Sequence, residues 1–113
     1  MNDDVKKYID KQLISQKEIL EKIHTLTKTN HPAWNENVFG GCITYEADNE
    51  NKFGKVYLVA LKDHINFGVA VKGLSDNILE KLDKVGKVTG SIEIRSLDDI
   101  NKKEIIKILK GIK

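Results

Sequence analysis

The spacing of apolar residues changes near Asn37, and this change constrains the fold more than any other feature of the chain. Before it, residues such as Val5, Ile19 and Ile23 recur every three or four positions, as on one face of a helix. From Asn37 to Val71, apolar and polar residues alternate instead, as they do in strands. We therefore expect N-terminal helices followed by an antiparallel run of strands.

The N-terminal part predicts two helices. We expect a short one from about Asp3, a break near Leu13, and a longer one from about Ser15 to Lys28. Ser15-Gln16-Lys17-Glu18 has the form of a capping box, in which serine and glutamate each accept from a free backbone N–H group. His31-Pro32 should end the second helix, because the residue before a proline avoids the helical conformation.

The middle of the chain predicts three strands. Gly40-Gly41 marks their entry, Cys42 to Ala47 alternates, and a polar turn over 48–52 precedes the strand from Lys55 to Lys62. Both alternating sets are apolar from Val56 to Leu61, which is typical of a central strand covered on both faces. In the next strand one side is apolar (Ile65, Phe67, Val69, Val71), and the other carries His64, Asn66, Gly68 and Ala70.

The C-terminal part predicts a short helix over Asp76 to Leu82, a turn at Gly86-Lys87 and a last strand over Ser91 to Arg95. Asn101-Lys102-Lys103-Glu104 looks like a further capping arrangement before a terminal helix whose apolar positions are Ile105, Ile106, Leu109 and Ile112. The expected fold is α+β: an antiparallel sheet with N-terminal and C-terminal helices packed on one face, in a single domain over 1–113.

Composition excludes several classes of protein. The net charge of +2 is the difference between 19 basic and 17 acidic residues, and Arg95 is the only arginine, so specific nucleic-acid binding is not expected. Cys42 is the only cysteine, so the chain forms no internal disulfide, and a buried structural role is expected for it. The acidic start and the short apolar stretches give no signal sequence or membrane span, so we expect a cytoplasmic, soluble protein.

Several segments together resemble one family. Ala60 to Gly68, with Lys62-Asp63-His64 at its centre, is similar to the "Phe-Lys-Asp-His-Val-x-Leu-Gly" segment of the YdhG-like family, listed as domain of unknown function 1801. Gly73-Leu74-Ser75-Asp76 follows at the right spacing, and Ile92 to Ile100 resembles the family's "Ile-Lys-Ile-Arg-Ser-Leu-Glu-Asp-Ile" ending. Tyr8-Ile9 and Pro32 with Glu36 also fall where the family places them, so the resemblance covers nearly the whole chain.

The resemblance implies a YdhG-like domain and, because some members are described as frataxin-like iron chaperones, a metal-handling role with iron. The chain departs from the family at two places. Gly40 and Ile43 stand where members often carry an aromatic residue and a proline, and Gly90-Ser91 replaces an Arg-His pair. Where those residues contribute to a ligand site in relatives, that contact is altered here.

Four residues are candidates for ligand binding: His64, Asn66, Arg95 and Trp34. His64 and Asn66 lie on the polar side of their strand, where Gly68 and Ala70 leave room for a groove; alternatively, His64 only holds its turn through Asp63 or the backbone. Arg95 could clamp a carboxylate or phosphate, or pair with Glu93.

Trp34 and Phe39, in a segment expected to be irregular, could floor a pocket or seal the edge of the core. The metal ligands stay unknown. His24, His31 and His64 are on separate elements, and His24 is expected on the solvent side of its helix. A carboxylate site for iron could run along Asp3, Asp4, Asp10, Glu18 and Glu21, but the interleaved lysines favour a solvated surface there.

These observations favour a non-enzymatic binding protein for a small ligand or a metal, without nucleic acid or membrane. The alternative is a protein-interaction subunit or adaptor, which could be a homodimer and should expose an apolar patch around Trp34 and Phe39. A small hydrolase-type enzyme with His64 as general base ranks last, because no partner nucleophile and no catalytic motif is visible.

Overall fold

The computed structural model describes residues 1–47 and 54–112, so the expected polar turn over 48–52 lies outside the described residues. Two helices come first, α1 (Asp3–Asp10) and α2 (Ile14–Asn30). The strands follow: β1 (Asn35–Phe39), β2 (Cys42–Glu46), β3 (Val56–Ala60) and β4 (Ile65–Ala70). The chain then forms α3 (Asp76–Leu79), β5 (Lys84–Val85), β6 (Thr89–Ile94), the 3-10 turn η1 (Leu97–Asp99) and α4 (Lys102–Gly111).

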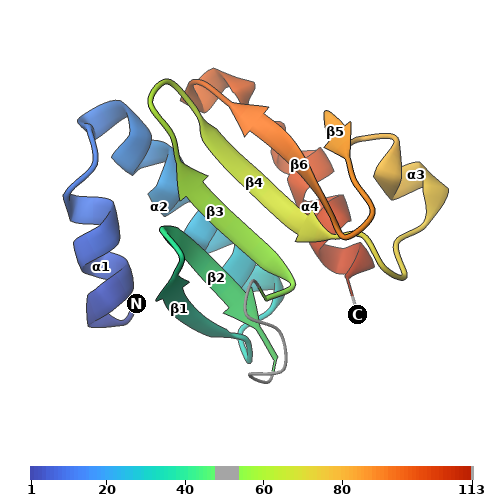
Figure 1. Cartoon of the computed structure of the whole chain (residues 1–113), viewed down its shortest axis with the longest axis horizontal. Coiled ribbons are helices and arrows are strands. Elements are labelled where there is room, and N and C mark those ends of the chain that lie inside the picture. The colour runs from blue at the N-terminus through green and yellow to red at the C-terminus, as the bar shows by residue number, and fades with distance from the viewer. Residues whose placement is uncertain (48–53, 113) are drawn as a thin grey trace.

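The strands of the described residues form one sheet in the order β1-β2-β3-β4-β6-β5, and every neighbouring pair is antiparallel. Helices α2 and α4 lie behind this sheet in Figure 1, while α1 lies beside β1. The prediction of an α+β fold, with an antiparallel sheet and terminal helices on one face, is confirmed.

The core fills the space between the sheet and its helices. Ile65, Phe67 and Val69 of β4 point toward the helices and are fully buried, as their alternation predicts. From the helices, Ile23 and Ile108 meet them, also fully buried. Burying apolar surface of this kind is the main source of stability for a domain of this size.

Local sequence explains most element boundaries. The Gly40-Gly41 pair has φ of 59° and 79°, the left-handed conformation that a tight hairpin turn between β1 and β2 requires. Asn101 caps α4, because its side chain accepts a hydrogen bond from the Glu104 N–H at 3.2 Å, as predicted. The break near Leu13 is also confirmed, since this residue is extended between the two N-terminal helices.

Three local predictions were wrong. Ser15 caps nothing: α2 begins at Ile14 with Leu13 as its N-cap residue and no side-chain cap. The segment expected to be irregular forms the edge strand β1, which asparagine-rich Asn35–Phe39 did not suggest because asparagine disfavours strands. Strand β3 is central, but Tyr57 and Val59 are only half-buried, so its second face is not covered as the first is.

Candidate functional site

One face of the sheet carries no helix among the described elements, and Figure 1 is viewed onto it. We call it the open face. Its side chains are fixed by the strand register, which sets Val59 beside Asn66 and Asn66 beside Glu93, and sets Tyr57 beside Gly68 and Gly68 beside Ser91. Because alternate residues of a strand point to opposite faces, all of these lie opposite the core.

Two of the candidate residues meet at one end of the open face. Lys62 and Asp63 form the turn between β3 and β4, closed by a hydrogen bond from the Leu61 N–H to the His64 carbonyl at 2.9 Å. The Asp63 carboxylate contacts both the His64 ring, at 2.7 Å from Nδ1, and the Arg95 guanidinium, at 3.0 Å from Nη1. Asp63 therefore links His64, which directly precedes β4, to Arg95, which directly follows β6.

The ion pairs continue across β6 to the edge of the sheet. Arg95 Nη2 lies 3.3 Å from Glu93 Oε2, and Glu93 Oε1 lies 3.2 Å from Lys84 Nζ. The resulting chain of contacts, which we call the charged row, consists of His64, Asp63, Arg95, Glu93 and Lys84. Sequence could not decide whether Arg95 clamps a ligand or pairs with Glu93; in this structure Arg95 pairs with Glu93 and Asp63.

The electrostatics of the charged row reflect these contacts. Hydrogen bonds from His64 and then Arg95 hold the pKa of Asp63 below its usual value, and the Lys84 ammonium does the same for Glu93. Asp63, in turn, raises the pKa of Arg95. Each charge already has an opposite charge beside it, so the row offers an added anion little net attraction.

Asn66 differs from the charged row next to it. Its amide oxygen is buried and accepts no hydrogen bond from a described residue. A buried polar atom of this kind is uncommon, because leaving it unpaired costs free energy. Among the candidate residues on the open face, Asn66 is thus the one with a buried polar atom that no described residue pairs.

Trp34 does not join the other candidates. It is 6% exposed and packs with the core on the helical side of the sheet. Its ring stacks on His31, with centroids 3.7 Å apart and planes 3° from parallel. Of the two roles considered for Trp34, it seals the edge of the core.

A hollow of about 370 Å³, the aromatic hollow, lies on the open face and is lined by Cys42, Tyr57, Val88 and Thr89. The sequence predicted a buried structural role for Cys42 and did not point to the other three residues. Cys42 is buried, and burial raises the pKa of its thiol, which keeps the thiol neutral. A signal was present in Tyr57, an aromatic residue on the side of β3 opposite the core positions, but only the register places it across from a glycine.

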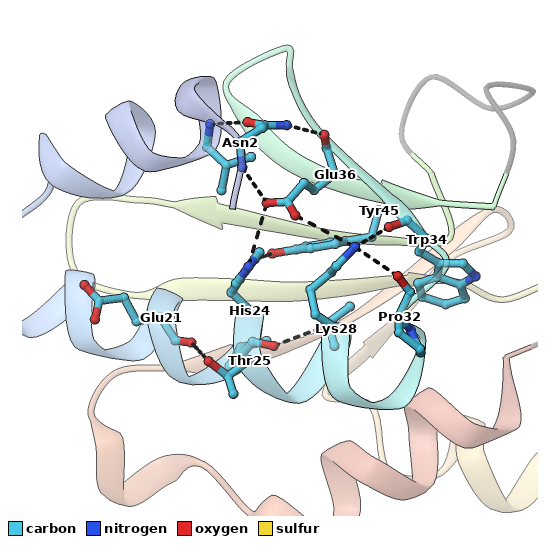
Figure 2. Close-up of polar contacts among 12 residues, drawn as sticks. Asn2, Glu21, His24, Thr25, Lys28, Pro32, Trp34, Glu36 and Tyr45 are labelled. Atoms are coloured by element: carbon cyan, nitrogen blue, oxygen red, sulfur yellow. Dashed lines mark hydrogen bonds and ion pairs between the residues drawn. The ribbon is translucent and has the colours of Figure 1, made fainter.

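The helical side of the sheet holds a second group of polar residues, drawn in Figure 2. His24 Nδ1 lies 2.7 Å from the Tyr45 hydroxyl, and His24 Nε2 lies 3.7 Å from Glu36 Oε2. Lys28 Nζ lies 3.8 Å from Glu36 Oε1, and Asn2 Nδ2 donates to the Glu36 carbonyl at 2.6 Å. We call Asn2, His24, Lys28, Glu36 and Tyr45 the buried polar cluster, after His24 and Tyr45, which are buried; Lys28 and Glu36 are half-buried, and Asn2 is exposed at its rim.

The expectation that His24 faces solvent was wrong: it is 7% exposed and points toward the sheet. The helical spacing could have predicted this burial, because His24 is four residues after the core residue Leu20 and three before the buried Thr27, on one face of α2. Burial lowers the pKa of His24, and Lys28 and the N-terminal ammonium act in the same direction, while Glu36 opposes them.

The contact with Tyr45 bears on which nitrogen of His24 carries the proton. Burial raises the pKa of Tyr45, so its hydroxyl stays protonated. A neutral imidazole with its N–H on Nε2, toward the Glu36 carboxylate, leaves Nδ1 to accept a hydrogen bond from that hydroxyl. The buried polar cluster is thus a satisfied part of the core with neutral His24.

The described residues do not form a metal centre. Among residues 1–47 and 54–112, no three His, Cys, Asp or Glu side chains converge in a way that could hold an ion. The acidic positions proposed for iron are spread over α1 and α2, and Asp10 is paired with Lys17 at 3.2 Å. The described residues therefore do not fit the iron site that the family resemblance implies. No helix in the described part of the chain has the length and apolar character needed to cross a bilayer.

Comparison with protein-family models, with curated proteins and with solved structures gives no match for this chain.

Proposed function

We propose that this protein is a non-enzymatic binding domain of the cytoplasm, YdhG-like in fold, whose ligand lies on the open face of the sheet. The observation that carries the proposal is a central sheet with helices on one face only, so that Tyr57, Asn66 and Thr89 are directed away from the core. An antiparallel sheet can leave one face to solvent, and here that face is neither uniformly polar nor flat, because it contains a hollow.

The edges of the sheet favour a ligand on the face over an added strand. Along β6, the Asp83 carboxylate accepts from the Glu93 N–H at 2.9 Å, and the Asp99 carboxylate accepts from the Arg95 N–H at 2.9 Å. At the other edge, Asn2 donates to the Glu36 carbonyl, and α1 lies beside β1. Side chains therefore occupy backbone groups that strand addition would need.

An enzymatic role for His64 has less support. Asp63 orients its ring, but this is the only hydrogen bond of the His64 side chain to a described residue. A general base needs a group within reach whose proton it removes, and the described surroundings supply none as a nucleophile.

The adaptor alternative predicts an exposed apolar patch around Trp34 and Phe39, and only part of this patch is exposed. Trp34 is buried, and Phe39, at 43% exposed, is the remaining member of the pair. Light scattering at increasing protein concentration separates the two ideas, since an adaptor that works as a homodimer would give twice the monomer mass.

The proposal is tested by an NMR screen with soluble fragment molecules, read from the backbone amides. We expect binding fragments to shift the amides of Gly68, Thr89 and Ser91 and to leave those of α2 and α4 in place. Fragments that shift only helix amides, or none that shift the sheet, would contradict it. The frataxin-like, iron-handling hypothesis is tested separately by adding ferrous iron to the metal-free protein in a calorimeter. Heat above the buffer blank would support that hypothesis.

A further inference from the structure

The aromatic hollow has an unusual floor, because the Tyr57 ring lies flat across the neighbouring strand. A Cβ atom built on Gly68 would lie 1.9 Å from Tyr57 Cζ, 2.1 Å from Cε1 and 2.5 Å from Cε2. Three ring atoms this close to one point mean that a face of the ring rests on Gly68. Any side chain at position 68 would displace the ring, so glycine is what permits this arrangement.

The other face of the ring is directed away from the sheet into the hollow. Tyr57 is half-buried and lines it together with Cys42, Val88 and Thr89. No hydrogen bond joins the Tyr57 hydroxyl to a described residue. The ring is thus held by packing below and is free for contact above, which makes it a flat platform.

The walls of the hollow are mostly apolar. Cys42 contributes a neutral thiol, which behaves as a small apolar group. Val88 belongs to the three-residue turn between β5 and β6 and is 71% exposed. This turn is fixed at its base, since the Val71 N–H donates to the Val88 carbonyl at 3.0 Å and the Gly86 N–H to the Thr89 carbonyl at 2.8 Å. Val88 is therefore held beside the platform although solvent surrounds it.

We propose that the aromatic hollow binds a planar, largely apolar small molecule that stacks on Tyr57, with a polar group able to hydrogen-bond to the Thr89 hydroxyl. A volume of about 370 Å³ accommodates one small ring system. Stacking against an aromatic ring favours flat ligands over saturated ones of the same size. The inference rests on the proposed function and adds the chemical class of the ligand.

Two matched probes test the ligand class: 2-naphthol, which is planar, and decahydro-2-naphthol, which has the same carbon skeleton and hydroxyl but is not planar. We expect 2-naphthol to shift the Gly68 and Thr89 amides at lower concentration than its saturated counterpart. Replacing Tyr57 by leucine keeps apolar bulk but removes the ring, and should lower the affinity for 2-naphthol by roughly two- to tenfold. Replacing it by phenylalanine keeps the platform and should leave the affinity unchanged.

Gly68→Ala tests the platform without altering Tyr57 itself. The added methyl group must push the ring off its seat, so 2-naphthol binding should fall, while Ser91→Ala in the same row should not change it. Dispersed amide spectra show that each variant is folded. Equal affinity for both probes, or full affinity in Tyr57→Leu, would overturn the inference but leave the proposed function standing if the open-face amides still shift. Failure of the proposed function itself would give a different result, because no fragment would then shift the open-face amides.

Discussion

The buried polar cluster and the charged row each contain a histidine and a carboxylate, yet they lie on opposite faces of the same sheet and differ in burial. In the buried cluster, desolvation lowers the pKa of His24, and Tyr45 and Glu36 surround the ring. In the charged row, the hydrogen bonds that lower the pKa of Asp63 form at the surface. Water can replace the surface contacts but not the buried ones, so the first network supports the fold and the second is dispensable for it.

The largest expected effect on stability comes from removing a hydrogen bond of the buried polar cluster. Tyr45→Phe removes the donor to His24 Nδ1 and leaves a buried nitrogen without a partner, so the free energy of unfolding should fall by about 1–3 kcal/mol. Urea unfolding followed by circular dichroism measures it. Tyr57→Phe is the matched control, and we expect it to change stability by less than about 0.5 kcal/mol. Equal losses in the two variants would mean that the faces do not differ in this way.

A smaller effect should appear as a pH dependence of stability. Because the folded-state pKa of His24 is lowered, the unfolded chain binds its proton more readily than the folded chain does. The contribution of His24 to the free energy of unfolding is therefore fully present above its pKa in the unfolded chain, about 6.5. It declines as the pH falls below that value toward the pKa of His24 in the folded chain. Lys28 and the N-terminal ammonium increase this decline, and Glu36 reduces it.

Urea midpoints measured between pH 7.5 and 5.5 test this sign. The wild-type protein should lose stability over that range by more than His24→Gln does, because only the wild type carries the buried titrating group. A variant with the same slope as the wild type would show that the decline comes from other residues.

The smallest effect is expected in the charged row. Arg95→Gln removes the ion pairs to Asp63 and Glu93, which lie at the surface, so the urea midpoint should move by little more than the error of the measurement. If this variant instead unfolds as readily as Tyr45→Phe, the row contributes to the fold and the comparison of the two faces is wrong.

Sequence periodicity was sufficient for the fold class but not for the networks. The alternation of Ile65, Phe67 and Val69 against His64 and Asn66 correctly separated the core side of β4 from the open side. It could not show that Asp63 reaches both His64 and Arg95, because that contact depends on β4 pairing with β6. His24 was misplaced for a related reason: α2 is covered on a wide arc, and its polar residue is satisfied by Tyr45 from a distant strand.

The candidate site was predicted in part. The polar side of β4 was anticipated from Asn66 and Gly68, but the role of Gly68 beneath the Tyr57 ring depends on the register of β3 against β4, which periodicity does not supply. Trp34 was included as a candidate because an aromatic ring in an irregular segment could floor a pocket as well as seal the core edge; its burial and its stacking on His31 show that it seals the core edge.

The central claim is that binding takes place on the open face and not on the helical one. It is tested most directly by measuring the affinity of the tightest fragment for two matched variants, Thr89→Arg in the aromatic hollow and Thr29→Arg on the exposed surface of α2. We predict that binding is lost in Thr89→Arg and unchanged in Thr29→Arg, with both proteins folded. Binding that survives Thr89→Arg and disappears in Thr29→Arg would place the ligand on the helices and contradict the claim.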